Sequence, residues 1–429
     1  MIRMECDILV IGAGVLGLST AYHLKERNSR KKVLVVDRFG GPGQGNSAKS
    51  EGGIRNMFTS ETNYLLADST IDWFAHLEED QGYNLKLQHI GYLWLYSSEQ
   101  YRHKREALKK IESKGAELRT LERGEFEHMI PAMVTEFEDD EEAELLGLEP
   151  VDFGIFGAKC GSIDADALVR SYEQEFLKLG GEIMYSTEVE KLILKPIEEL
   201  ELPGEPFVWQ EKRILGAETS KGEIEAETTV VAAGVWSERL LHPMGLDSYM
   251  RPKKRQIFVF KDPKLEGLLK AEGFNEYGTL PLTILPKASI LFRPELSEGS
   301  FWLGCADDLG RAFGLEDDPQ AEEDYYTNNV YHVLVKYFPC FQDVRPMNMW
   351  AGQYAINSFD GLPVVTGEEG LIYVGAASGS GIMKADALGR IAAALYAGEE
   401  EAELYCGRRF RVADIGVRQR RVERETMII

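Results

Sequence analysis

The sequence predicts an α/β protein with a parallel-stranded domain assembled from discontinuous segments and a second α+β domain built on a mostly antiparallel sheet. Three observations predict this fold. A strand, a glycine-rich turn and a helix open the chain, and a similar strand, turn and helix return near residue 375. Between them, residues 251–305 alternate short apolar runs with turn residues, which is typical of antiparallel strands.

The first forty residues carry a dinucleotide-binding pattern. A short apolar run leads into Gly12-Ala13-Gly14-Val15-Leu16-Gly17, and a second apolar run stops at Asp37. Gly12 permits a tight turn, Gly14 lets a pyrophosphate approach the backbone, and Gly17 lets helix and strand pack closely. The helix N-terminus offers N–H groups to the phosphates, and Asp37 is spaced to bind an adenosine ribose. The pattern predicts a Rossmann-like domain without choosing between NAD and FAD.

Composition narrows the class of protein. The chain has 429 residues, which favours two domains, and its net charge of −23 argues against sequence-independent binding to nucleic acid. The acidic run 136–144 is expected to form an exposed loop or hairpin tip. The basic stretch 408–424 is compatible with docking on the acidic surface, with a partner contact or with disorder.

The five cysteines are scattered, with no CxxC pair. This spacing predicts no disulfide framework and no metal or iron–sulfur site, and it fits a reducing, cytoplasmic compartment. We expect no transmembrane segment, because no apolar run approaches about 18 residues. Peripheral membrane contact and oligomeric state stay open at this stage.

Hydrophobic periodicity places the remaining elements. Helices are expected over 61–79, 99–114, 165–179 and 385–396, where apolar residues recur at helical spacing. Strands are expected at 91–96, 182–185, 187–192, 214–217, 222–226 and 228–237, then at 256–260, 280–285, 290–293, 301–304, 361–365 and 371–375.

The second glycine turn, Gly379-Ser380-Gly381-Ile382-Met383-Lys384, favours a flavin. The first helix N-terminus already serves an adenine nucleotide, so a second one has another electron-rich group to bind. The N1–C2=O edge of a flavin gains negative charge on reduction, and the N–H groups of residues 381–384 with their helix dipole would stabilise it.

With these motifs in hand, the chain resembles the D-amino-acid oxidase and sarcosine (glycine) oxidase family of FAD enzymes. The resemblance extends over most of the chain. Within the family it is most similar to the archaeal dye-linked L-proline dehydrogenases. The residues that carry the resemblance are 12–17 with Asp37-Arg38, 46–50, 52–55, 161–164, 230–237, 251–255, 300–311, 360–363 and 379–384.

The resemblance implies an FAD-binding domain from segments 1–87, 155–240 and 347–429, and a substrate domain from 88–154 and 241–346. It implies cofactor contacts from Gly12, Gly14, Val15, Leu16, Asp37, Arg38, Ser47, Ser50, Gly52, Gly53, Ile54, Val189, Ala233, Gly234, Trp236, Gly352, Gly379, Gly381, Ile382, Met383 and Lys384.

The resemblance also implies a site for a small amino or imino acid. Arg55 and Lys384 match carboxylate-binding positions, where an Arg fork and a Lys point charge would hold the substrate. Tyr354 is expected beside the substrate amine, in an aromatic group with Trp350 and Phe292.

Two departures from sarcosine-oxidase-like relatives shape the expected activity. Residues 350–354 contain no cysteine, so FAD is expected to bind non-covalently. Trp302 stands where some relatives carry an oxygen-activating lysine, which favours a dehydrogenase that reduces an external acceptor (a dye, a quinone or a partner protein).

The expected reaction is oxidation of an amino or imino acid, L-proline first, to the imine. The alternatives are an oxidase of sarcosine, glycine or a D-amino acid that releases hydrogen peroxide, a flavin-carrying subunit of an electron-transfer complex, and an oxidase of a hydroxy acid or glycerol 3-phosphate.

Overall fold

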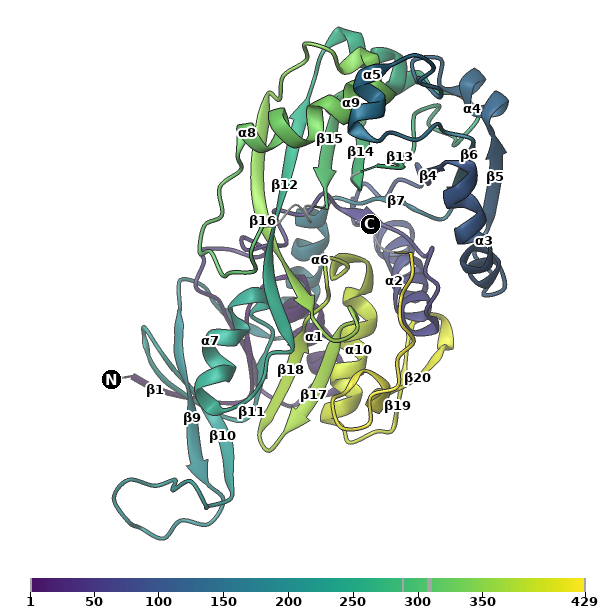
Figure 1. The fold of residues 1–429 in the computed structure, drawn as a ribbon. Coiled ribbons are helices and arrows are strands. Elements are labelled where there is room, and N and C mark those ends of the chain that lie inside the picture. Colours follow the sequence, from purple (N-terminus) through teal and green to yellow (C-terminus); the bar gives the residue numbers. More distant parts are fainter. Residues whose placement is uncertain (1, 288, 307–310, 428–429) are drawn as a thin grey trace.

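The computed structural model describes residues 2–287, 289–306 and 311–427, and two large sheets organise them (Figure 1). The first sheet has the strand order β17-β18-β11-β1-β2-β8, and β10 and β9 extend it from β11. Its strands are β1 (Ile2–Ile11), β2 (Val33–Val36), β8 (Glu182–Met184), β9 (Val189–Pro196), β10 (Lys212–Thr219), β11 (Gly222–Val231), β17 (Val364–Glu368) and β18 (Leu371–Gly375).

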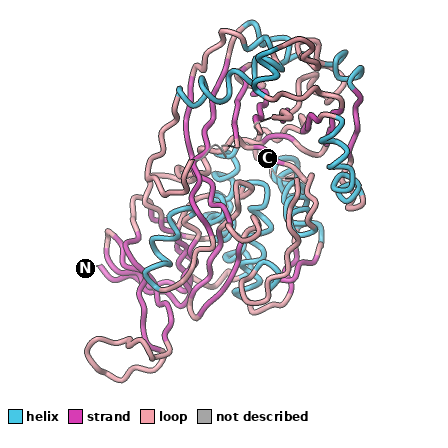
Figure 2. Tube along the Cα trace, in the orientation of Figure 1, coloured by secondary structure: helices cyan, strands magenta, loops and turns pink. Residues whose placement is uncertain are grey.

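The centre of the first sheet is parallel and covered by helices. β1 pairs in parallel with β2 and β11, and β11 with β18. α1 (Val15–Arg27) packs between α6 (Ala165–Lys178) and α10 (Ala385–Tyr396), and α2 (Glu61–Glu79) packs on α10. Figure 2 shows these helices gathered beside the strands, while the connection from β9 to β10 projects away as a long loop. Strands buried in this way read as continuous apolar runs, which is why the sequence revealed them.

The second sheet is mostly antiparallel, in the order β16-β12-β15-β14-β13-β4-β6-β5, with β13 and β4 parallel. A phenylalanine-rich core covers it, to which α9 (Tyr331–Tyr337) contributes. Its strands are β4 (Tyr92–Tyr96), β5 (Leu118–Glu122), β6 (Phe153–Gly157), β12 (Met250–Phe260), β13 (Leu282–Ile284), β14 (Ile290–Glu295), β15 (Ser300–Cys305) and β16 (Asn348–Asn357).

The structure differs from the expectations at several places. The strand expected at 228–237 ends at Val231, and Gly234–Trp236 form a helical turn instead. β16 pairs with β12 over its full length, so the second sheet includes a strand from the segment expected in the FAD-binding domain. Residues 136–140 of the acidic run form a loop as expected, whereas residues 141–144 belong to the short helix α5 (Glu141–Leu146), which Asp140 caps by accepting a hydrogen bond from the N–H of Ala143. Phe292 is fully buried in the second core, where its ring packs edge to face on Phe338 and Phe341.

The basic C-terminal stretch docks on the body of the protein. Arg420 forms ion pairs with Asp360, Arg418 with Glu368, and Arg408 with Asp68. Of the three alternatives, docking on an acidic surface is therefore the one observed. Among the motif residues quoted above, Asp308 to Gly310 lie outside the described residues.

Across the three described ranges, the chain has no helix with the length and apolar character needed to cross a membrane.

Candidate cofactor and substrate site

A cavity that opens to solvent runs along the carboxyl ends of the parallel strands. β1, β2 and β11 contribute their ends to one part of its wall, and β12, β16 and the loop after β18 contribute to the other. This is the usual position of a nucleotide in an open parallel sheet.

The first glycine turn is built for close approach. Gly12 has φ +109°, and a Cβ there would lie 2.6 Å from the carbonyl oxygen of Ala232. A Cβ on Gly17 would lie 1.9 Å from the carbonyl oxygen of Gly12, so helix and turn could not pack with any side chain there. Gly14 precedes α1 without a side-chain cap, and Ser47 accepts a hydrogen bond of 3.1 Å from the N–H of Val15. The helix N-terminus therefore faces the cavity with little covering it.

Asp37 lies at the end of β2 and braces this turn. Its carboxylate accepts hydrogen bonds from the N–H groups of Ala13 at 2.6 Å and Phe39 at 2.8 Å. Burial raises the pKa of Asp37, and these two hydrogen bonds and the charge of Arg38 only partly offset that effect. Asp37 thus has a structural task in addition to the ribose contact expected from the sequence.

Arg38 forms part of a cation cluster at the cavity wall. Its guanidinium lies 4.2 Å from the ring centre of Trp236. Asp317 binds Arg38, Trp236 and Arg239 together. Arg239 was not expected from the sequence. Its position as a basic residue in the helix that follows a nucleotide-binding strand could have indicated a place at the cavity.

Most of the expected cofactor residues line the cavity, and some do not. Gly12, Gly14, Val15, Leu16, Asp37, Arg38, Ser47, Ser50, Val189, Ala233, Gly234, Trp236, Gly352, Tyr354, Gly379, Gly381 and Ile382 are in its wall. Gly52, Gly53, Ile54, Arg55, Met383 and Lys384 are not among the lining residues.

Close packing explains why glycines stand at the two positions before Ile54 and Arg55. A Cβ on Gly52 would lie 2.0 Å from the carbonyl oxygen of Ile163, and one on Gly53 would lie 2.4 Å from the Tyr92 hydroxyl. They let β3 (Gly53–Ile54) pair with β7 (Gly161–Ser162) beneath the second sheet.

The second glycine turn places Tyr354 in the cavity wall. Gly379 has φ +80°, and a Cβ there would lie 2.3 Å from the Tyr354 ring. Burial and the nearby Glu51 raise the pKa of Tyr354 to about 12, so its phenol is neutral at physiological pH. Gly381 and Ile382, which follow in the same turn, also line the cavity.

The structure brings Arg55 and Lys384 together behind that end. The Arg55 guanidinium lies 4.0 Å from the ring centre of Phe58, and Nζ of Lys384 lies 4.9 Å from the same centre. Both side chains are buried. Burial and the charge of Arg55 lower the pKa of Lys384 to about 7, while Glu425 acts in the opposite direction. Lys384 also donates hydrogen bonds to Asn63 and Ser380, each at 2.6 Å.

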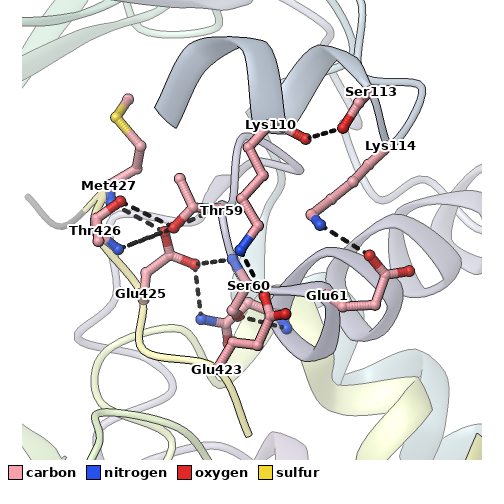
Figure 3. Close-up of polar contacts among 11 residues, drawn as sticks. Thr59, Ser60, Glu61, Lys110, Ser113, Lys114, Glu423, Glu425, Thr426 and Met427 are labelled. Atoms are coloured by element: carbon pink, nitrogen blue, oxygen red, sulfur yellow. Dashed lines mark hydrogen bonds and ion pairs between the residues drawn. The ribbon is translucent and has the colours of Figure 1, made fainter. Parts of the chain in front are cut away.

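The C-terminal segment lies against this pair of cations. Glu425 accepts hydrogen bonds from Thr59, Ser60 and Asn63 at the start of α2, and Figure 3 shows this network. Two residues later, the carbonyl oxygen of Met427 accepts a hydrogen bond from Arg55 at 2.7 Å. No sequence motif marks this contact.

Two further residues of the cavity wall escaped sequence reasoning, namely Glu51 and Arg255. The charged run Arg251-Pro252-Lys253-Lys254-Arg255 carries part of the family resemblance, which assigns no cofactor contact to it. In the structure it lies in β12, whose side chains alternate so that Arg255 is at the cavity, 5.3 Å from the ring centre of Tyr354.

Trp302 and Trp350 pack edge to face in the second sheet, with ring centres 4.9 Å apart. The guanidinium of Arg293 lies 4.4 Å from the ring centre of Trp302. A cation is therefore present beside the position where the sequence suggested only an indole.

Comparisons with known proteins agree with this geometry. Residues 7–395 match the family described as FAD dependent oxidoreductase, or DAO. The FAD-dependent oxidoreductase domain-containing protein 1 of Xenopus laevis is 22% identical over 91% of this chain and 79% of its own.

Solved structures show the same fold. L-proline dehydrogenase from P. horikoshii has a TM-score of 0.73 at 20% identity, over 93% of this chain and 95% of its own. Glycine oxidase from Geobacillus kaustophilus has a TM-score of 0.72 at 19% identity, over 92% and 96%. The match over residues 7–395 shows that the chain belongs to the DAO family of FAD-dependent oxidoreductases.

Proposed function

We propose that the chain is a dehydrogenase that oxidises a small amino or imino acid, L-proline first among the candidates, to the imine. Its electrons pass to an external acceptor. The observation that carries the proposal is the buried pair Arg55 and Lys384 on one phenylalanine ring. Two buried cations repel each other and lose hydration, so an anionic ligand that binds both is strongly favoured.

A substrate carboxylate is the anion that fits. The planar guanidinium of Arg55 would bind two carboxylate oxygens, and Lys384 would add a point charge. Bound FAD would supply the acceptor for the two electrons and the hydrogen of the substrate. The task of the protein is to hold the substrate, and Tyr354 would orient it from the cavity wall.

The Met427 carbonyl occupies one donor of Arg55. The proposal therefore includes a local rearrangement in which the substrate carboxylate replaces this carbonyl oxygen. A charged carboxylate accepts a stronger hydrogen bond from a guanidinium than a neutral carbonyl does, which favours the exchange.

L-proline is placed first because the sequence motifs resemble those of dye-linked proline dehydrogenases. The solved L-proline dehydrogenase, with a TM-score of 0.73, supports the choice through its fold. Glycine oxidase has almost the same score, so fold similarity alone does not choose between the two substrates.

A second candidate is an oxidase that reduces oxygen to hydrogen peroxide. The observation in its favour is Arg293, a cation 4.4 Å from the Trp302 ring centre. This cation is partly neutralised, because it pairs with Glu295 at 3.0 Å and donates to the carbonyl of Glu51 at 2.8 Å. The dehydrogenase therefore remains the first proposal.

The test is the visible spectrum of the purified, FAD-loaded protein under anaerobic conditions. Addition of L-proline is expected to bleach the flavin band, and admission of air is expected to restore it slowly. Rapid recovery with formation of hydrogen peroxide would favour the oxidase. A band unchanged by L-proline but bleached by sarcosine, glycine or a D-amino acid would contradict the proposed substrate.

A further inference from the structure

Glu51 is a carboxyl group in the cavity wall without a partner of its own. Its Oε2 atom is buried and has no hydrogen-bond partner among the described residues. A Cβ on Gly304 of β15 would lie 3.5 Å from this atom, so the carboxyl packs against bare backbone. A buried carboxyl without hydrogen bonds is costly in its charged form, and such groups occur where they serve a function.

The position of Glu51 is the flavin end of the cavity. Asp37 marks the adenosine end, because it braces the first glycine turn at the end of β2. Glu51 instead interacts electrostatically with Tyr354, which packs on the second glycine turn at Gly379. Because the second glycine turn is the one expected to serve the flavin, Glu51 would lie nearer to the ring system of bound FAD than to its phosphates.

The groups that face Glu51 come from several strands. Arg293 of β14 is the cation that acts on it, but the bonds of this guanidinium go to the main-chain oxygen of Glu51, to Pro294 and to Glu295. Tyr92 of β4 and Tyr354 of β16 face it as neutral phenols, because burial raises the pKa of each. Arg255 of β12 lines the same end of the cavity beside Tyr354.

The carboxyl is poised to change its protonation state. Burial raises the pKa of Glu51 to about 7, and the charge of Arg293 only partly opposes this effect. Near neutral pH the group is therefore a mixture of carboxylate and acid. A new negative charge nearby shifts such a group toward the acid.

We propose that Glu51 takes up one proton when the FAD ring system is reduced and releases it on reoxidation. A reductant would supply two electrons and one proton to bound FAD, which leaves one net negative charge, and the Glu51 carboxylate binds a second proton from solvent to become a neutral acid. When an acceptor removes the electrons, the proton returns to solvent. Glu51 thereby limits the build-up of negative charge at this end of the cavity.

The inference rests on FAD as the cofactor but not on the substrate, because dithionite can supply the electrons. The visible band of the oxidised FAD-loaded protein is recorded from pH 5 to 9, and the titration is repeated after anaerobic reduction. The oxidised wild type is expected to titrate near pH 7, as Glu51 does. After reduction the midpoint is expected to rise by at least about one pH unit. The flavin reduction potential should accordingly fall more steeply with pH between the two midpoints.

In the Glu51→Gln variant the visible band should no longer titrate with Glu51 in either oxidation state. The plot of reduction potential against pH should also lack its steeper part. The matched control is Glu188→Gln, which removes a carboxyl from the wall of the same cavity and should leave the visible titrations in place. Identical titrations in wild type and Glu51→Gln would overturn the proposal. If Glu51→Gln fails to retain FAD, Glu51→Asp provides the test, because a shifted midpoint supports the proposal and an unshifted one contradicts it. Bleaching by L-proline is scored separately, so failure of the proposed substrate does not affect this result.

Discussion

The carbonyl oxygen of Met427 accepts a hydrogen bond of 2.7 Å from Nη2 of Arg55, across 372 residues of sequence. The same guanidinium donates from Nη1 to the carbonyl of Met57 and lies over the Phe58 ring. Two carbonyls and one aromatic face fix the plane of the group. The end of the chain thus positions the cation that we expect to bind the substrate carboxylate.

Fixing the C-terminal segment should prevent this exchange. Oγ1 of Thr426 lies 3.1 Å from Oγ1 of Thr59, close enough for a disulfide between cysteines at these positions. In the oxidised Thr59→Cys, Thr426→Cys variant we expect kcat/KM for the substrate to fall at least about tenfold, because the Met427 carbonyl stays on Arg55. Reduction with dithiothreitol should restore activity.

The two single cysteine variants, treated with the same oxidant, are the controls for this experiment. They report the loss of each hydroxyl and any reaction of the native cysteines. Full activity in the oxidised double variant would show that the carbonyl stays in place during turnover. The proposed exchange at Arg55 would then be wrong.

Glu425 should stabilise the folded protein through its charge. Burial alone would raise its pKa, but hydrogen bonds from the Thr59 hydroxyl and from the N–H groups of Met427 and Thr59, with the charge of Arg55, lower it to about 2. A carboxyl whose pKa is lower in the folded state stabilises that state above its unfolded pKa. The shift predicts that Glu425→Gln lowers the free energy of unfolding at pH 7 by up to about 3 kcal/mol.

The pH dependence gives this prediction its check. The stabilisation is complete above the unfolded pKa of about 4.5 and is lost as the pH falls through the folded pKa near 2. Urea unfolding of wild type and Glu425→Gln should therefore differ at pH 7 and converge toward pH 2. Glu423→Gln is the control, because its partner Lys110 is a surface residue. Equal stability of Glu425→Gln and wild type at pH 7 would contradict the assigned network.

Lys384 should make anion binding depend on pH. Its pKa of about 7 means that it loses its charge as the pH rises through neutrality. Affinity for a carboxylate should consequently decrease as the pH rises above 7. The decrease should end at the pH where Lys384 loses its proton even with the carboxylate bound. Pyrrole-2-carboxylate, a planar analogue of proline, can be titrated against the flavin spectrum at pH 6 and pH 9.

Variants at this position separate charge from shape. Lys384→Arg should bind the analogue with similar affinity at both pH values, whereas Lys384→Met should bind it weakly at both. Lys114→Met removes a nearby charge that pairs with Glu61 and should behave like the wild type. A pH-independent affinity in the wild type would place the anion away from Lys384.

Much of the parallel sheet and its helices could be predicted because local pattern and tertiary environment agree there. α2 and α10 begin and end where helical spacing placed them, since Ser60 caps α2 and a glycine turn precedes α10. β16 was harder. No strand was expected over its residues, and β16 becomes evident only through its pairing with β12 in the folded protein.

The site was predictable where glycines mark it. Gly12 and Gly379 line the cavity, and both have a positive φ at which a Cβ would clash with neighbouring atoms. Glu51 and Met427 have no such signature. A lone glutamate and a terminal methionine acquire their roles from residues brought near by folding, Arg293 in one case and Arg55 in the other.

FAD should be released intact when the protein is denatured. Among the described residues that line the cavity there is no cysteine. Gly352, Gln353 and Tyr354, from the segment where some relatives attach their flavin through a cysteine, are part of the cavity wall. Precipitation of the yellow holoenzyme with trichloroacetic acid should leave the flavin in the supernatant, where chromatography should identify it as FAD. A pellet that stays yellow, and that yields a flavin-bearing peptide after proteolysis, would show a covalent bond. Tyr354 would then be the first residue to examine, because its phenol lines the cavity at the flavin end.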